Sequence, residues 1–166
     1  MRRKSLEHAI CPIARSLDCI GDWWSLLIVR DAFIGRRRFT EFQQSLGLAR
    51  NILATRLRKL VERGIFRLEP ASDGSKYREY VLTEKGRSLR MVVAALRVWG
   101  TQWMFADSPQ LSSVRDAVTG EEIVGFGFQS RGGRFVVPSE LKFPTTPPPP
   151  SPRPRRVAPK PRSRSR

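Results

Sequence analysis

Hydrophobic and polar positions follow a helical period near the start of the chain, and glycines and prolines divide this pattern into segments. Residues 5–46 predict three short helices. Pro12 occupies a natural first helical position, which predicts a helix from Pro12 to about Ile20 with Cys11 as its N-cap. Asp22 is a capping residue for a second helix through DWWSLLIVRDAF.

A turn with three consecutive arginines separates this second helix from a third one. Thr40 and Gln43 have the S/T-x-x-E/Q spacing of a capping box, in which each side chain bonds a free backbone N–H of the other residue. The pattern therefore predicts that the third helix begins at Glu41 and ends near Gly47.

The stretch ARNILATRLRKLVERGIF predicts a fourth helix with two different faces. At 100° per residue, four apolar side chains fall within about 100° of one another and form a stripe that should be buried: Leu53, Leu57, Leu60 and Val61. Four polar side chains cluster on the opposite side: Asn51, Thr55, Arg58 and Glu62. Gly64 is the C′ glycine expected just after the helix.

Two short strands, within IFRLEP and YREYVLT, flank a polar turn at Asp73-Gly74 and predict a β-hairpin. Thr83 then caps one long helix through EKGRSLRMVVAALRVWGTQWMF. Five apolar residues of this helix are spaced 3, 4, 3 and 4 apart, a heptad-like seam that favours packing against another helix: Leu89, Val92, Leu96, Trp99 and Trp103.

The remaining chain divides by composition. Residues 107–143 predict a small β-rich extension with two or three weak strands and turns at Thr119-Gly120 and 131–133. Residues 144–166 are rich in Pro and Arg and poor in apolar side chains, so they predict a disordered basic tail. Residues 5–106 form the main domain, which predicts a mainly α fold with a small β-hairpin wing, the order of a winged helix-turn-helix.

The charge changes the functional picture. The chain of 166 residues has 31 Lys and Arg against 15 Asp and Glu, a formal charge of +16. The last 23 residues hold seven of the basic side chains, so residues 1–143 keep a surplus of nine. Such an excess favours a polyanionic partner, nucleic acid or an anionic membrane surface. A spanning segment or a signal peptide is not expected from the apolar runs, and the two cysteines agree with a reducing, cytoplasmic compartment.

Several short motifs, in order, are similar to the HxlR-type family of winged helix-turn-helix transcriptional regulators: the Cys-Pro opening, IGDWW, RFTEF, LRKL and LTEKG. The resemblance covers about Cys11 to Gly100. It implies a dimeric DNA-binding protein, usually bacterial, in which the first and last helices of the domain build the dimer and the fourth helix reads DNA. The five seam residues are then the expected dimer interface. In many relatives a small hydroxyl residue precedes the fourth helix, whereas this chain has Ala49 and Arg50.

We expect the polar face of the fourth helix to enter the major groove of double-stranded DNA, with Asn51, Thr55 and Arg58 at base edges. The expected phosphate contacts are Arg50, Arg56 and Lys59 on this helix, Lys76 and Arg78 on the wing, and Arg38 in the turn before the third helix. A solvated, merely charged surface is the alternative for each of these residues. Glu62 lies at the far end of the helix and is not expected to touch DNA.

Cys11 is a candidate redox sensor. A helix N-cap places a thiolate beside free N–H groups and the positive end of the helix dipole, and some members of the resembling family use a cysteine at the matching Cys-Pro position to sense oxidants or electrophiles. Many relatives have that cysteine without a known sensing role. Cys19 is about 12 Å further along a continuous helix, too far for an internal disulfide, and is expected to be a small core residue.

The sequence disfavours an enzyme, because it has one histidine, His8, and none of the nucleotide-binding or nucleophile motifs. We expect no metal and no cofactor. The main hypothesis is a dimeric, sequence-specific regulator on a near-palindromic operator. The family resemblance implies repression as the commoner outcome, with activation as the alternative. The alternative is a nonspecific, nucleoid-associated nucleic-acid-binding protein driven by charge and tail. A third possibility adds a small-molecule effector in a cavity lined by Trp23, Trp24, Trp99 and Trp103, although aromatics at helical spacing are more often core.

Overall fold

The computed structural model of the chain describes residues 5–105, 114–123, 125 and 127–143. The helices are α1 (Pro12–Ile20), α2 (Trp23–Phe33), α3 (Phe39–Leu46), α4 (Arg50–Glu62), α5 (Glu84–Ser88) and α6 (Arg90–Met104). The strands are β1 (Phe66–Pro70), β2 (Arg78–Leu82), β3 (Phe128–Gln129) and β4 (Phe135–Val136), followed by the 3₁₀ helix η1 (Pro138–Glu140). The predicted fold class is confirmed, with the wing formed by the antiparallel pair β1 and β2.

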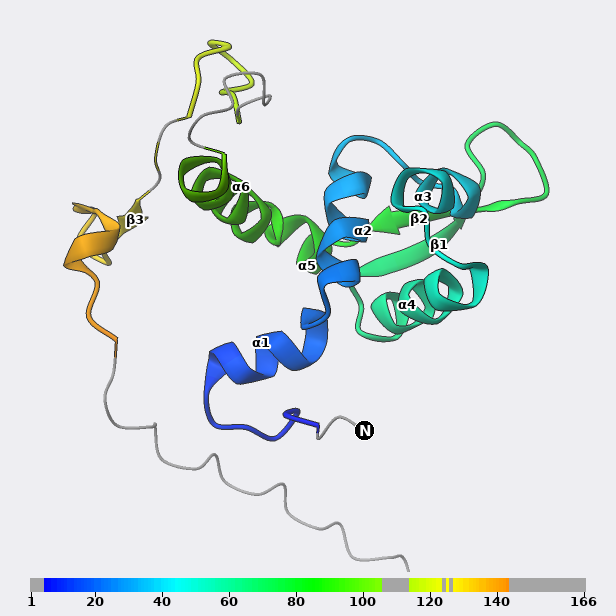
Figure 1. Cartoon of the computed structure of the whole chain (residues 1–166), viewed down its shortest axis with the longest axis horizontal. Coiled ribbons are helices and arrows are strands. Elements are labelled where there is room, and N and C mark those ends of the chain that lie inside the picture. The colour runs from blue at the N-terminus through cyan, green and yellow to red at the C-terminus, as the bar shows by residue number, and fades with distance from the viewer. Residues whose placement is uncertain (1–4, 106–113, 124, 126, 144–166) are drawn as a thin grey trace, which may run out of the picture.

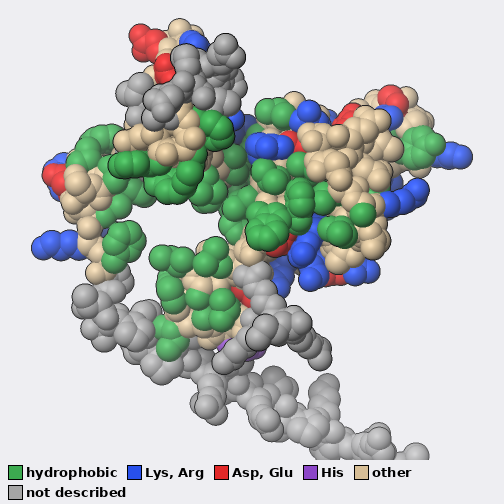
Figure 2. Space-filling view, viewed as in Figure 1, with side chains coloured by type: hydrophobic (Ala, Val, Ile, Leu, Met, Phe, Trp, Pro, Cys, Tyr) green, Lys and Arg blue, Asp and Glu red, His purple; other side chains and the backbone are tan. Residues whose placement is uncertain are grey.

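The helices α2, α3 and α4 and the wing form one body, from which α1 and α6 project to the same side (Figure 1). Lys and Arg side chains gather on this body, whereas hydrophobic side chains gather on α1 and α6 (Figure 2). No helix in the described part of the chain combines the length and apolar character required to cross a bilayer. The body is therefore the basic part of the molecule, and the two projecting helices are its apolar part.

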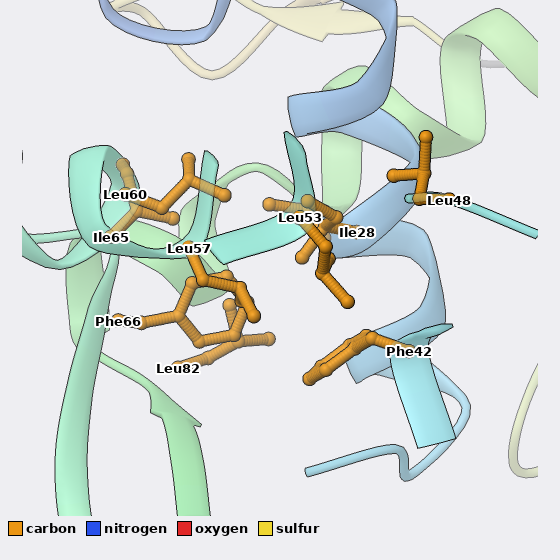
Figure 3. Packing of buried hydrophobic residues seen from close by; sticks show 10 residues of the cluster. Ile28, Phe42, Leu48, Leu53, Leu57, Leu60, Ile65, Phe66 and Leu82 are labelled. Atoms are coloured by element: carbon orange, nitrogen blue, oxygen red, sulfur yellow. The ribbon is translucent and has the colours of Figure 1, made fainter. Parts of the chain in front are cut away.

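The core lies where α4 packs on α2, α3 and the wing (Figure 3). The predicted stripe of α4 supplies Leu53, Leu57 and Leu60, all buried, while Val61 is half-buried. The rings of Phe42, Phe66 and Tyr80 meet edge-on with centroids 6.3 to 6.4 Å apart, an arrangement that aromatic quadrupoles favour. This packing seats both α4 and the wing on α3.

The predicted helix caps are mostly confirmed. Cys11 is the N-cap of α1, and Asp22 caps α2 by accepting a hydrogen bond from the Ser25 backbone N–H at 3.0 Å. Gly64 ends α4 with a left-handed φ of +68°, a conformation that favours glycine. Ala49 is the N-cap of α4, and its side chain cannot bond the first turn.

The predicted capping box of the third helix is wrong. Helix α3 begins at Phe39, before Thr40. The Glu41 carboxylate accepts hydrogen bonds from the backbone N–H groups of Arg37 and Arg38 at 2.7 and 2.9 Å. A carboxylate is a stronger acceptor than the Thr40 hydroxyl, so the helix begins earlier than the pattern indicated.

The single long helix predicted after Thr83 is also wrong, because α5 ends at Ser88 and α6 begins at Arg90. The Ser88 hydroxyl donates to the Lys85 carbonyl oxygen at 2.8 Å, which is the oxygen that the Leu89 N–H would bond in a continuous helix. The Leu89 N–H donates instead to the Gly86 oxygen at 3.2 Å. Leu89 lies between the two helices and packs against the core, while the rest of the seam continues along α6.

The expected weak strands of the C-terminal segment are present. Arg115 pairs with Glu122 in an isolated antiparallel bridge around the turn at Gly120. The strands β3 and β4 pair antiparallel across a turn that contains Gly133. The predicted tail, 144–166, lies outside the described residues.

Candidate nucleic-acid interface

The solvent-facing side of α4 presents the polar residues that the pattern placed there. Asn51, Arg58 and Lys59 are exposed, and Thr55 is partly exposed beside them. The Thr55 hydroxyl donates to the Asn51 carbonyl oxygen at 2.8 Å, and Arg58 lies 3.8 Å from the Glu62 carboxylate one turn on. An exposed pair at this spacing is weak. The Arg58 guanidinium is therefore available to another acceptor at small cost.

Two other basic residues of this region hold α4 against the helices before it. The Arg56 guanidinium lies 3.1 Å from the Asp22 carboxylate at the start of α2. Arg63 lies 3.1 Å from the Asp18 carboxylate of α1. Of the phosphate contacts expected from the sequence, Arg56 thus already has a carboxylate partner, which the spacing along α4 could not reveal. Arg50 is exposed at the first turn, with its guanidinium 5.9 Å from the centroid of the Phe39 ring.

The wing is anchored to the turn before α3. The Tyr80 N–H donates to the Arg37 carbonyl oxygen at 2.8 Å, and the Arg38 guanidinium lies 2.6 Å from Asp73 at the tip of the wing. Glu79 is buried and accepts hydrogen bonds from the backbone and hydroxyl of Ser72. Arg38, expected at a phosphate, is therefore bound to the wing. Its hydrogen bond is the main reason that the pKa of the Asp73 carboxyl lies well below its usual range.

Replacing Asp73 by asparagine is expected to loosen the wing at neutral pH, because the amide carries no charge for Arg38. The Ala71 N–H, which closes the wing by donating to Tyr77 at 3.1 Å, should exchange with solvent several times faster in hydrogen-exchange NMR. Since the native pKa of Asp73 is lowered, its contribution is complete above the ordinary carboxyl range, about pH 4. That contribution is lost as the pH falls through the lowered native value.

The matched control is Glu69→Gln on the same hairpin. Glu69 pairs with Arg67 on its own strand and, within the described part of the chain, makes no ion pair with the turn before α3. Unchanged Ala71 exchange in Asp73→Asn, or equal acceleration in both variants, would contradict the anchoring role.

A groove of about 570 Å³ separates the wing from the first turn of α3. Its lining includes Arg38, Phe39, Thr40, Tyr77 and Arg78. The Tyr77 side chain is 62% exposed at the wing and was not among the residues singled out from the sequence. The sequence signal that could have singled out Tyr77 is its position as an aromatic residue directly after the basic Lys76. Lys76 is exposed, whereas Arg78 donates to the Leu68 carbonyl oxygen at 2.9 Å.

Comparison with profiles of protein families matches residues 19–108 to the family described as HxlR-like helix-turn-helix. The matched residues contain α2 to α6 and the wing, which are the elements that build the candidate interface. The chain belongs to the HxlR-like family. This membership confirms the resemblance drawn from the sequence motifs.

Two relatives show how far the HxlR likeness extends. Rv3095 of Mycobacterium tuberculosis, named an uncharacterized HTH-type transcriptional regulator, is 42% identical over 92 residues, 55% of this chain. The chain spans 58% of the length of that curated relative. The crystal structure of PA1607, named as a candidate transcription factor, is 43% identical with a TM-score of 0.75, covering 86% of this chain and 100% of PA1607. That share extends beyond residue 108 into the C-terminal segment.

A third relative is a redox protein. The redox regulator HypR, in its oxidised form, is 32% identical and has a TM-score of 0.51, covering 55% of this chain and 96% of HypR. All three relatives are named as regulators or transcription factors rather than enzymes. Among the described residues, no group of three His, Cys, Asp or Glu side chains is placed to hold a metal ion.

The apolar seam of this HxlR-like chain lies mostly open to solvent. Leu89 packs on the core, whereas Val92, Leu96, Trp99 and Trp103 are exposed along α6, Trp103 to 65%. A cavity of about 400 Å³ lies between α2 and α6, lined among others by Leu26, Arg30, Val93 and Arg97. None of the four tryptophans proposed for an effector cavity lines it. The cavity between α2 and α6 therefore does not match the tryptophan-lined cavity that the sequence suggests as one possibility.

The two cysteines lie in different surroundings. Cys11 is exposed at the start of α1, and Cys19 is half-buried against the core, as expected. Both thiols are free.

Proposed function

We propose that this protein is a dimeric, sequence-specific DNA-binding transcriptional regulator of the cytoplasm, acting as a repressor on a near-palindromic operator. The proposal rests chiefly on the polar face of α4, which a buried leucine stripe holds outward on a basic winged body. Asn51, Thr55 and Arg58 would bond base edges in the major groove, with Arg50 and Lys59 at phosphates.

The wing would contribute the flanking contacts. Lys76 is exposed beside the groove next to α3, and Tyr77 and Arg78 line that groove. Among the described residues Lys76 forms no ion pair. A phosphate could therefore bind the Lys76 ammonium without displacing a carboxylate. Arg38 and Arg56 each have a carboxylate partner within 3.1 Å. In this proposal they position the wing and α4, and they reach phosphate only by exchanging that partner.

Dimerisation would use α1 and α6. Ile13 and Leu17 of α1 are exposed, as are Trp99 and Trp103 of α6. A self-complementary contact of two copies buries the same patch twice and presents two α4 helices with two-fold symmetry. Half-sites on the DNA should then be about 34 to 36 Å apart, or a multiple of that spacing.

The test is a footprint of the full chain on the DNA flanking its own gene, at near-physiological salt with excess competitor duplex. Protection of two symmetric half-sites is the expected result. Equal protection of unrelated duplexes would favour the alternative function, a nonspecific nucleic-acid-binding protein, which the charge of +16 makes physically plausible. The two functions also differ in how steeply the affinity for DNA falls as the salt concentration rises. Nonspecific binding depends almost wholly on phosphate contacts, so its affinity should depend mainly on salt rather than on DNA sequence.

A redox effector is a second proposal, favoured by the exposed Cys11 at the α1 N-cap and by the likeness to HypR. Oxidised glutathione would exchange with the Cys11 thiolate, forming a mixed disulfide and releasing one glutathione thiolate. Because α1 belongs to the proposed dimer contact, this adduct should weaken operator binding severalfold, and dithiothreitol should restore it.

The expected control behaviour is that Cys11→Ser no longer responds to oxidised glutathione, while Cys19→Ser still does. A response that survives in Cys11→Ser and disappears in Cys19→Ser would assign the sensing to Cys19 and would contradict the proposal. Binding is read by fluorescence anisotropy on the footprinted operator, and the adduct by intact-protein mass.

A further inference from the structure

Three groups of hydrophobic side chains remain exposed on the described chain. They lie before and within α1 (Ile10, Ile13, Leu17), along α6 (Val92, Leu96, Trp99, Trp103) and in the C-terminal segment (Phe128, Phe135, Val137, Phe143). Figure 2 shows hydrophobic side chains of α1, α6 and this segment around the same open space. An apolar surface of that extent is unusual on a monomer and indicates an interaction site.

The C-terminal segment has almost no core of its own. Each strand of its hairpin is two residues long, and a hairpin of this size is marginal in water without a surface to pack on. The Phe135 ring packs over the backbone of Gly127, so this ring makes a contact within the C-terminal segment. Val136 is the one buried hydrophobic residue in the described part of this segment, 114–143. The hairpin therefore needs a second apolar surface.

Two observations indicate where that surface lies. The segment follows α6 along the chain, and together with α1 and α6 it borders the same open space (Figure 1). The alignment with PA1607 extends into this segment at a TM-score of 0.75, so the segment is part of the architecture shared with a solved chain. The Arg134–Glu140 ion pair, at 3.1 Å, holds η1 against the hairpin and keeps the apolar residues together.

We propose that residues 114–143 form an arm that docks on α1 and α6 of a second copy of this chain. This inference rests on the proposed dimer and assigns it a further interface. The partner's apolar helices would enter the open space that α1, α6 and the arm surround, and they would cover Phe128, Val137 and Phe143. In a single chain these side chains face solvent, Phe143 to 73%.

The arm is tested by cross-linking within mixed dimers of the full chain. A photoreactive benzoylphenylalanine replaces Phe143, and unlabelled subunits are exchanged with ¹⁵N-labelled ones until native mass spectrometry shows mixed dimers. After illumination, links from residue 143 to peptides of α1 or α6 are expected in mixed light–heavy pairs. The same photoreactive residue at Val118, a turn position that is 93% exposed, is the matched control and should give few such links.

Sedimentation equilibrium separates the arm from the dimer itself. Val137→Ser is expected to raise the dimer Kd by about tenfold, because a valine that is exposed in the single chain loses its apolar contact with the partner. Val118→Ser should leave the Kd within about twofold of the wild-type value. If the wild-type protein is a dimer but residue 143 links only to peptides of its own isotope label, and Val137→Ser leaves the Kd unchanged, the arm is excluded while the dimer remains. A wild-type chain that stays monomeric would overturn the proposed dimer and the arm with it.

Discussion

Arg58→Ala is expected to weaken binding to the operator by about ten- to a hundredfold while leaving the fold unchanged. A bidentate contact from an arginine to a base is worth about 1–3 kcal/mol of discrimination, and each 1.4 kcal/mol is a factor of ten in Kd. The Arg58 side chain is exposed, and its ion pair with Glu62 at 3.8 Å is weak. The measurement is a titration of operator and scrambled duplexes by fluorescence anisotropy at fixed salt.

The matched control for Arg58→Ala is Glu62→Ala, which removes the other member of the same i,i+4 pair. Glu62 is not expected to touch DNA, and removing its negative charge should leave binding unchanged or slightly tighter. Lys59→Ala provides a second comparison, because loss of a phosphate contact should weaken binding to operator and scrambled DNA alike. An Arg58→Ala protein that keeps its preference for the operator would exclude Arg58 as a base-reading residue.

Gly86→Ala is expected to lower the free energy of unfolding by about 3 kcal/mol. A Cβ at this position would lie well inside contact distance of the Ile65 carbonyl oxygen and 2.9 Å from Leu82 Cδ2. That oxygen also accepts a hydrogen bond from the Thr83 N–H at 3.0 Å, so it cannot retreat without breaking the junction between wing and α5. Calorimetry should show a Tm decrease of about 12–24 °C, since 1 kcal/mol corresponds to about 4–8 °C in a domain of this size.

Gly100→Ala is the matched control, because Gly100 lies inside α6 and a Cβ there would meet nothing within 4 Å. Alanine loses less backbone entropy than glycine in a helix, so this variant should be more stable by up to about 1 kcal/mol. Equal melting temperatures for Gly86→Ala and the wild-type protein would mean that the junction can relax around the new methyl group. The close approach at Gly86 would then be unimportant for stability.

Much of the fold could be predicted because it depends on local chemistry. The leucine spacing of α4 determines which face is buried, and Asp22, Gly64 and Thr83 act on backbone groups within a few residues. The two errors arose where local donors and acceptors compete. The Glu41 carboxylate accepts from the N–H groups of Arg37 and Arg38, so α3 begins before Thr40, and the Ser88 hydroxyl bonds a carbonyl oxygen that a continuous helix would use.

The site was predicted only in part. Residues of one helix face, Asn51, Thr55 and Arg58, are brought together as expected because a helix fixes their relative positions. Which arginines are already paired could not be predicted in this way. Asp22 meets Arg56 across 34 residues, and Asp73 meets Arg38 from the tip of the wing. Such pairs exist only after the helices and the wing have packed.

The sequence by itself determined the order of helices and strands, the buried stripe of α4, the basic character of the body and the family, because periodicity, caps and motifs are properties of neighbouring residues. Only the tertiary structure decided that Arg38 and Arg56 have carboxylate partners, that Leu89 joins the core and that Val92, Leu96, Trp99 and Trp103 stay exposed. Burial and ion pairing depend on distances between segments far apart in the chain, and the packing of the whole domain sets those distances.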